Sequence, residues 1–307
     1  MTPIPARPVL VTFDFEGCWG MPHDAPYDQD RSTGKILRVL ADHDVSAVFF
    51  VVGRLAEERP DLVKEIAASG HQIGLHGYRH EHFELLTPPA RAELRDELKG
   101  ASRAVEAVIG ERPIAYRSPY LLGRRHHDEA LAPLLAAAGF RWTSDREVRF
   151  CEELFRPDRV PVRSVRDAAA RLGLFGDRGL GALAAIALNA NHLGRETALG
   201  SARARASWLL GGRRPFRRDG LVEVALQAPL DCDLLGLPRP DEETPDELLG
   251  FAAERLAGGC GRTGDPYVLS FHDWIAGTAN RPQLLDEVLA RLGSLGAPVI
   301  DAADWRP

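Results

Sequence analysis

Short apolar segments alternate with amphipathic segments through the first half of the chain, and this alternation constrains the fold more than any other feature. Residues 46–52, SAVFFVV, form a continuous apolar run of the kind that is buried on both faces of a sheet. Residues 55–68 have the spacing of a helix that stops before Gly70. Such alternation predicts parallel strands joined by right-handed crossovers, in a barrel or in an open doubly wound sheet. Further strands are expected at residues 8–15, 72–75, 114–116, 140–143, 267–271 and 298–300, and further helices from residue 35 and at 89–109, 128–138 and 282–292.

The alternation is interrupted from about residue 151 to residue 264. This segment holds an Ala/Leu-rich helical stretch, an arginine-rich stretch and one clear strand pattern at residues 221–226. Strand and helix patterns return at residue 267, and no linker of low complexity separates the two parts. We therefore expect residues 1–307 to form a single α/β domain, a barrel with a largely helical insertion at about 151–264.

Composition limits the class of protein. Hydrophobic residues make up 45% of the chain, enough for a core, and the net charge of -6 argues against a dedicated nucleic-acid partner. The four cysteines lie far apart without a C-x-x-C spacing, which favours a reducing compartment over a disulfide framework. The N-terminus lacks the apolar core of a signal peptide, and no apolar run is long enough to span a bilayer. We expect a cytoplasmic protein without a transmembrane segment.

Two carboxylates follow the first expected strand. Asp14 and Glu16 are two residues apart, so their side chains point to the same side of an extended chain. Placed at the end of a strand, one of them could bind a cation while the other moves protons.

A histidine pair follows the strand expected at residues 72–75. His76 and His80 are four residues apart, and over one helical turn both imidazoles could reach one metal ion. Two histidines with one carboxylate form a known catalytic zinc set that leaves one coordination position open.

Two further clusters lie at strand ends. Arg117 follows the strand at 114–116 and could orient a carboxylate, and a backbone N–H near Tyr120 could stabilise an oxyanion. His272 follows the strand at 267–271 and suits general acid catalysis near neutral pH. Because the carboxyl ends of parallel strands meet at one edge of a sheet, the four clusters are expected to form one site.

The ordered motifs resemble those of the polysaccharide deacetylases, also called the NodB-homology or carbohydrate esterase family 4 domain. The resemblance is close over about residues 8–145 and looser over 265–303. It is carried by Thr12-Phe-Asp-Phe-Glu16, His76-Gly-Tyr-Arg-His80, Arg117-Ser-Pro-Tyr120 and Leu269-Ser-Phe-His272.

This resemblance implies a distorted (β/α) barrel and one divalent metal ion, commonly zinc, which activates water for attack on an acetamide. Carried onto this chain, it makes Glu16, His76 and His80 the metal ligands, with Asp14 as an alternative carboxylate ligand. The expected catalytic residues are Asp14 as general base, Arg117 as the residue that holds Asp14, the Tyr120 N–H in the oxyanion hole, and His272 as the acid for the leaving amine.

The sequence departs from the family pattern in three places. Phe15 stands where the family usually has the second of two adjacent aspartates, so the carboxylate ligand is assigned to Glu16 of an Asp-x-Glu form. Gly77 stands where Ser or Thr is usual, which removes one hydrogen bond from the loop. The fourth motif of the family is only partly recognisable in this sequence. Asp145 is expected to orient Arg117, and the expected contacts to substrate come from Trp142, Asp145 and Trp274.

The function expected from these residues is metal-dependent N-deacetylation of an N-acetylated sugar. Without an export signal, a soluble, nucleotide-linked or lipid-linked intermediate is the favoured form of that sugar. One alternative is an allantoinase-like or cyclic-imide C–N hydrolase on the same scaffold. A second is a carbohydrate-binding protein without catalysis, although the chain keeps all the ligand, base and acid residues. The sequence predicts no oligomeric state.

Overall fold

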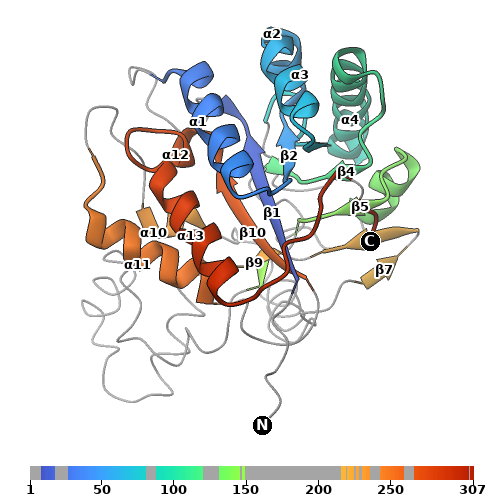
Figure 1. Ribbon diagram of the computed structural model, residues 1–307. Helices are drawn as coiled ribbons and strands as arrows, with labels where there is room; N and C mark the ends of the chain where they lie inside the picture. The colour runs from blue at the N-terminus through green and yellow to red at the C-terminus, as the bar shows by residue number, and fades with distance from the viewer. Residues whose placement is uncertain are drawn as a thin grey trace, which may run out of the picture.

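The computed structural model describes most of the expected barrel. Its strands form one curled sheet, and its helices pack on the outer face of that sheet (Figure 1). The described residues are 8–17, 27–80, 88–119, 131–145, 147–148, 216–218, 220–224, 226–227, 230–235, 243–258, 266–303 and 305–307.

Strand β1 (Val9–Phe15) lies in the middle of the sheet. It pairs in parallel with β10 (Tyr267–His272) on one side and with β2 (Val48–Val51) on the other. The order of the strands is β6-β9-β10-β1-β2-β3-β4-β5-β8-β7, and every pair among the described residues is parallel except β7 with β8. The remaining strands are β3 (Gln72–Leu75), β4 (Ala115–Tyr116), β5 (Trp142–Thr143), β6 (Glu147–Val148), β7 (Phe216–Arg218), β8 (Leu221–Glu223) and β9 (Leu226–Gln227).

Both faces of the central strands are buried. Alternate residues of β1, such as Phe13 and Phe15, pack in the cluster formed with the outer helices. The other residues of β1 face the inside of the curl. There Leu10 packs with Phe50 and Trp142 in a second cluster. The continuous apolar run of β2 follows from this double burial, because Phe49 and Val51 pack in one cluster and Val48 and Phe50 in the other.

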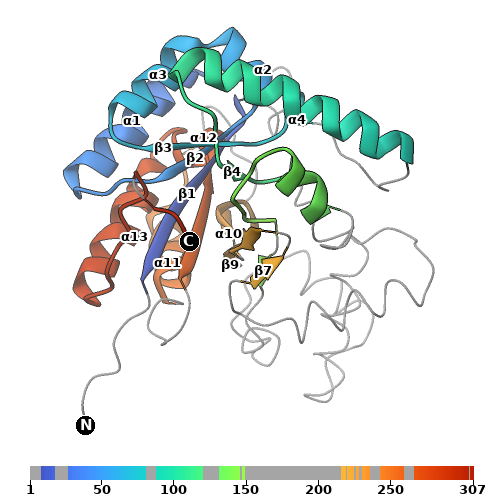
Figure 2. The same cartoon turned by 90° about the vertical axis from the view of Figure 1, so that its right-hand side faces the viewer.

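The helices cover the outer face of the sheet, as the two views in Figures 1 and 2 show together. Among the described residues, no helix is long and apolar enough to cross a membrane. Residues 131–137 are also helical, within the range expected for that helix. The named helices are α1 (Gln29–Asp42), α2 (Gly53–Glu58), α3 (Pro60–Ala68), α4 (Pro88–Ile109), α10 (Asp231–Leu235), α11 (Asp246–Ala257), α12 (Asp273–Ala276) and α13 (Pro282–Ser294).

The single helix expected at residues 55–68 is two helices. The chain breaks at Arg59, whose φ of -132° and ψ of 57° are not helical. The cause is Pro60, because its ring disfavours the helical conformation in the residue before it and suits the first position of a new helix.

The one strand expected at residues 221–226 is also two strands. β8 pairs with β5, and β9 pairs with β10 at a different place in the sheet. This part of the expected insertion therefore belongs to the central sheet. Residues 151–215 lie outside the described residues, so the extent of the insertion and the single domain stay predictions. The last expected strand, 298–300, is reduced to one bridge between Val9 and Val299.

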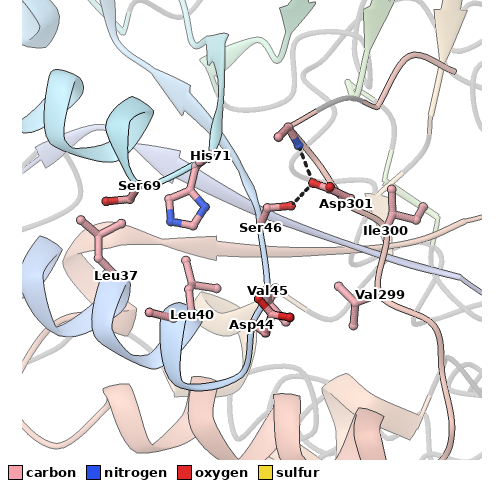
Figure 3. A pocket seen from close by; sticks show the side chains of 13 residues that line it. Leu37, Leu40, Asp44, Val45, Ser46, Ser69, His71, Val299, Ile300 and Asp301 are labelled. Atoms are coloured by element: carbon pink, nitrogen blue, oxygen red, sulfur yellow. Dashed lines mark hydrogen bonds between the residues drawn. The ribbon is translucent and has the colours of Figure 1, made fainter.

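A cavity of about 710 Å³ lies at the amino end of the sheet, below the starts of β2 and β3 (Figure 3). Its walls include Leu40 of α1 and the buried ring of His71, whose Nδ1 accepts a hydrogen bond from the Ala47 amide at 3.2 Å. This cavity is at the opposite end of the strands from the residues with predicted chemical roles.

Candidate metal and catalytic site

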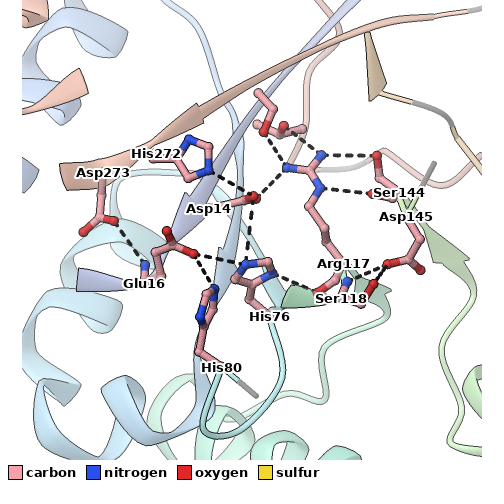
Figure 4. Close-up of polar contacts among 12 residues, drawn as sticks. Asp14, Glu16, His76, His80, Arg117, Ser118, Ser144, Asp145, His272 and Asp273 are labelled. Carbon is pink, nitrogen blue, oxygen red and sulfur yellow. Dashed lines mark hydrogen bonds and ion pairs between the residues drawn. The ribbon is translucent and has the colours of Figure 1, made fainter. Parts of the chain in front are cut away.

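The side chains predicted from four separate motifs converge at the carboxyl ends of the strands. Figure 4 shows them facing one another around one small volume. They come from β1, from the loop after β3, from the end of β4 and from the end of β10. The converging residues, all largely buried, are Asp14, Glu16, His76, His80, Arg117 and His272.

Three potential ligand atoms lie together in this volume. Glu16 Oε2 is 2.7 Å from His80 Nε2 and 3.3 Å from His76 Nε2. His76 Nδ1 lies 2.9 Å from the Arg117 carbonyl oxygen, which can only accept, so Nδ1 carries a proton and Nε2 faces Glu16. One carboxylate and two imidazoles within 4.8 Å of one another fit a single divalent ion with an open coordination position.

The environment of Glu16 favours it over Asp14 as the carboxylate ligand. Its other oxygen, Oε1, accepts a hydrogen bond from the Trp274 indole at 2.6 Å, which turns Oε2 toward the histidines. Burial alone would raise the pKa of Glu16, but the hydrogen bonds from His76 and His80 hold it well below the usual range. By contrast, Asp14 Oδ2 is 4.0 Å from His76 Nε2.

Asp14 is held by the Arg117 guanidinium. Nη1 of Arg117 is 2.6 Å from Asp14 Oδ1, and the arginine is fully buried with its charge over the ring of Phe50. Burial raises the pKa of Asp14, but the charges of Arg117, His76 and His272 outweigh it, so the pKa lies below 3.8. Asp14 is therefore an ionised carboxylate beside the candidate metal ligands, a suitable state for a proton acceptor.

His272 has a partner that sequence reasoning missed. Its Nδ1 lies 2.7 Å from Oδ1 of Asp231, whose Oδ2 accepts from the His272 backbone amide at 2.7 Å. Burial lowers the pKa of His272, but the charge and hydrogen bond of Asp231 raise it to about 10. Nε2 of His272 is 4.0 Å from Asp14 Oδ2, so a proton carried there faces the site. Asp231 is the first residue of α10 and follows the strand pattern expected at residues 221–226, and that position was the available signal.

The histidine loop is not the helical turn that the four-residue spacing suggested. Residues 76–80 form a bend in which Gly77 and His80 have positive φ, 72° and 58°. A Cβ at residue 77 would lie 3.0 Å from the ring of Pro119, so glycine fits both the conformation and the space. Both imidazoles reach Glu16 because of this left-handed geometry, not because of helical periodicity.

The loop is fixed from two helices. The amides of Gly53 and Arg54 at the start of α2 donate to the carbonyl oxygens of Gly77 and Tyr78, each at 2.9 Å. The buried Glu97 of α4 accepts from the Tyr78 and Arg79 amides at 3.1 and 3.4 Å. Gly77 lacks the side-chain hydrogen bond that Ser or Thr would give the loop at this position. The hydrogen bonds to Glu97 hold the loop instead.

Three residues expected to contact substrate have other surroundings. Trp142 is fully buried and packs edge-on against Phe50 and Trp305 inside the curl. Asp145 accepts hydrogen bonds from Ser118 and Thr143, so it anchors the residue after Arg117 rather than Arg117 itself. The indole of Trp274 binds Glu16, and Tyr120 lies outside the described residues.

One more buried acid supports the first motif. Asp273 follows His272 and accepts from the amides of Glu16 and Gly17 at 3.1 and 3.3 Å, and from the Tyr27 hydroxyl at 2.8 Å. Burial raises the pKa of Asp273 to about 7. The hydrogen bonds of Asp273 fix the backbone that carries Glu16. The position of Asp273 in the sequence did not indicate this role.

The fold and the site together define a (β/α) barrel with a candidate single-ion centre at the carboxyl ends of its strands. Residues 3–142 match the family model of the polysaccharide deacetylases. The resemblance to that family, predicted from the motifs, is thereby confirmed over this part of the chain.

Two relatives illustrate the match in sequence. The chain is 33% identical over 120 residues to a peptidoglycan-N-acetylglucosamine deacetylase of Bacillus cereus, covering 38% of this chain and 42% of the relative. It is 35% identical over 115 residues to a chitooligosaccharide deacetylase of Bradyrhizobium, covering 37% and 46%. The aligned part thus spans less than half the length of either relative.

Solved structures of low sequence identity support the fold. A candidate polysaccharide deacetylase from Mycobacterium smegmatis superposes with a TM-score of 0.58 at 19% identity, covering 97% of this chain and 91% of that one. A polysaccharide deacetylase of Bacillus cereus gives a TM-score of 0.50 at 18% identity, covering 95% and 90%. The predicted distorted (β/α) barrel is therefore confirmed.

Proposed function

We propose that this protein is a metal-dependent amide hydrolase that removes the acetyl group from an N-acetylated sugar. The observation that carries the proposal is the arrangement in Figure 4: a carboxylate and two imidazoles around one volume, with the carboxylate of Asp14 and the imidazole of His272 beside them. Two relatives in sequence are named as deacetylases of N-acetylglucosamine-containing and chitooligosaccharide substrates, which favours a sugar acetamide.

The proposed ion is zinc, held by Glu16, His76 and His80. The mixed carboxylate and imidazole donors suit it, and the open position suits a catalytic rather than a structural ion. When bound, such an ion lowers the pKa of water and polarises a carbonyl oxygen. The fit rests on the donor atoms, because Nε2 of both histidines and Oε2 of Glu16 face one another.

The protein side chains move the protons. Asp14 takes a proton from the water whose oxygen forms the new bond to the acetyl carbon, and Arg117 keeps Asp14 ionised and oriented through Oδ1. His272 gives its Nε2 proton to the sugar nitrogen as the carbon–nitrogen bond breaks, while Asp231 holds the Nδ1 proton. The products are acetate and the free amine. The Tyr120 amide remains the proposed donor to the carbonyl oxygen.

A soluble, nucleotide-linked or lipid-linked N-acetyl sugar is the proposed form of the substrate. The cytoplasmic location expected from the sequence stays a prediction, which cell fractionation would test.

A substrate panel tests the reaction class. Zinc-loaded protein would be incubated with N-acetylglucosamine, chitooligosaccharides, a nucleotide-linked N-acetyl sugar, allantoin and a cyclic imide. The proposal predicts acetate and free amine from at least one N-acetyl sugar, and none from Asp14→Asn. Turnover of allantoin or the imide alone would refute deacetylation and favour the other C–N hydrolases on this scaffold.

A further inference from the structure

A second set of potential metal ligands lies beside the first. One carboxylate oxygen of Asp231, Sγ of Cys232 and one ring nitrogen of His272 all lie within 4.8 Å of one another. The set is adjacent to the proposed zinc ligands, because His272 Nε2 is 4.0 Å from Asp14 Oδ2.

This second set differs from the first in chemistry. It contains sulfur, whereas Glu16, His76 and His80 offer only oxygen and nitrogen. A thiolate with an imidazole and a carboxylate favours thiophilic divalent ions such as Zn²⁺, Co²⁺ and Cd²⁺ over Mg²⁺ or Ca²⁺. Cys232 is only half-buried, so an ion can reach its sulfur.

The oxygen and nitrogen donors of this set are already fixed in place. Asp231 is fully buried, and its two oxygens accept from the backbone amides of Cys232 and His272, each at 2.7 Å. Its Oδ1 also lies 2.7 Å from His272 Nδ1. Two of the three donor groups are therefore preorganised.

We propose that Asp231, Cys232 and His272 form a second, weaker binding site for a thiophilic divalent ion, and that an ion bound there inhibits the enzyme. The ion takes the place of the proton between His272 Nδ1 and Asp231, and binding releases that proton and the thiol proton to solvent. The inhibitory part rests on the proposed function, since it requires His272 to be the proton donor.

The relative strength of the two sites follows from their contacts. The first set faces a shared volume with contacts of 2.7 and 3.3 Å. The second set must first give up the 2.7 Å hydrogen bond between Asp231 and His272. The second site therefore fills only after the first, at an excess of metal.

A cobalt titration tests the binding. Co²⁺ would be added to metal-stripped protein while visible and near-ultraviolet absorption are recorded. The first equivalent is expected to give only ligand-field bands, because its ligands carry no sulfur. The second equivalent is expected to add a thiolate-to-cobalt charge-transfer band. Cys232→Ser and Cys232→Ala should lose this band and the second equivalent while keeping the first.

His76→Ala is the matched control, since it should lose the first equivalent and keep the charge-transfer band. Thermal unfolding of each metal-free variant shows that it is folded. Absence of a charge-transfer band in the wild type, or a band that persists in Cys232→Ala, would overturn the second site. If the wild type binds no equivalent of cobalt that His76→Ala removes, the proposed function is overturned instead.

Inhibition is tested with Zn²⁺. Acetate release would be measured at one equivalent and at increasing excess, each variant being compared with its own activity at one equivalent. Wild-type activity should fall by about 10²-fold when the second site fills, the range expected for loss of a general acid. Cys232→Ala should need at least about tenfold more zinc for the same loss. Equal sensitivity of both proteins would refute inhibition through this site.

Discussion

The buried pair of Arg117 and Asp14 offers the sharpest test of how the site is held together. Arg117 is fully buried and donates five hydrogen bonds, to Asp14, Ser270, Thr12 and twice to Ser144. Arg117→Met keeps most of the volume but leaves the carboxylate of Asp14 buried without its counter-charge. Removal of one partner of such a pair destabilises a protein by about 3–5 kcal/mol.

A double-mutant cycle separates the pair from its surroundings. Asp14→Asn alone leaves the guanidinium without its carboxylate, and should also destabilise the protein. The double variant buries neither charge. Its loss of unfolding free energy should therefore be smaller than the sum of the two single losses by about 2–3 kcal/mol. Arg54→Met is the exposed control, because the 2.6 Å ion pair with Glu58 lies on the surface and should contribute less than about 1 kcal/mol.

The assay is urea unfolding of all five proteins after metal removal. Fluorescence and circular dichroism transitions must coincide for the free energies to be compared. If the double variant loses the sum of the single losses to within about 0.5 kcal/mol, the two side chains are not coupled. The account of Asp14 as a carboxylate kept ionised by Arg117 would then be refuted.

Three further predictions concern other contacts. Asp231→Asn should lower kcat for deacetylation by about 10–100-fold at unchanged metal content, because His272 loses the partner of its Nδ1; unchanged kcat would contradict this role. Glu97→Leu should raise the dissociation constant for Zn²⁺ by about tenfold and Glu97→Gln by less, since glutamine can still accept from the loop amides; chelator competition measures this. Burial lowers the pKa of His71 to about 4, so the neutral ring contributes stability above pH 6.5 that is lost as pH falls toward 4, by about 2–3 kcal/mol. Urea unfolding at several pH values should show that the free energy of unfolding depends less steeply on pH in His71→Gln than in the wild type. An unchanged dependence on pH would refute the lowered pKa of His71.

Local rules predicted most of the individual contributors to the site. The two-residue period of a strand placed Asp14 and Glu16 on one side of β1, and both point into the site. The rule that parallel strands end at one edge brought His76, Arg117 and His272 to the same place. The strand positions alone are enough to place these residues, and a continuous apolar run indicates a strand well.

Long-range geometry was beyond these rules. Asp231 and His272 are 41 residues apart, and nothing local shows that they pair. Trp142 was expected at the pocket, but β5 has two residues, and which of them faces the inside of the curl depends on its register with β4. His80 has a positive φ in a loop that is held by contacts with α2 and α4, and the sequence of the loop does not contain these contacts.

The central claim is that Glu16, His76 and His80 bind one divalent ion that deacetylation requires. The most direct test measures metal content and acetate release together, for the wild type, a variant that combines His76→Ala with Cys232→Ala, and the surface control Arg54→Met, after dialysis against limiting Zn²⁺. The account predicts about one equivalent of zinc and acetate release in the wild type and the control, and loss of both in the combined variant. Full zinc binding by the variant that combines His76→Ala with Cys232→Ala, or acetate release by wild type freed of metal, would contradict it.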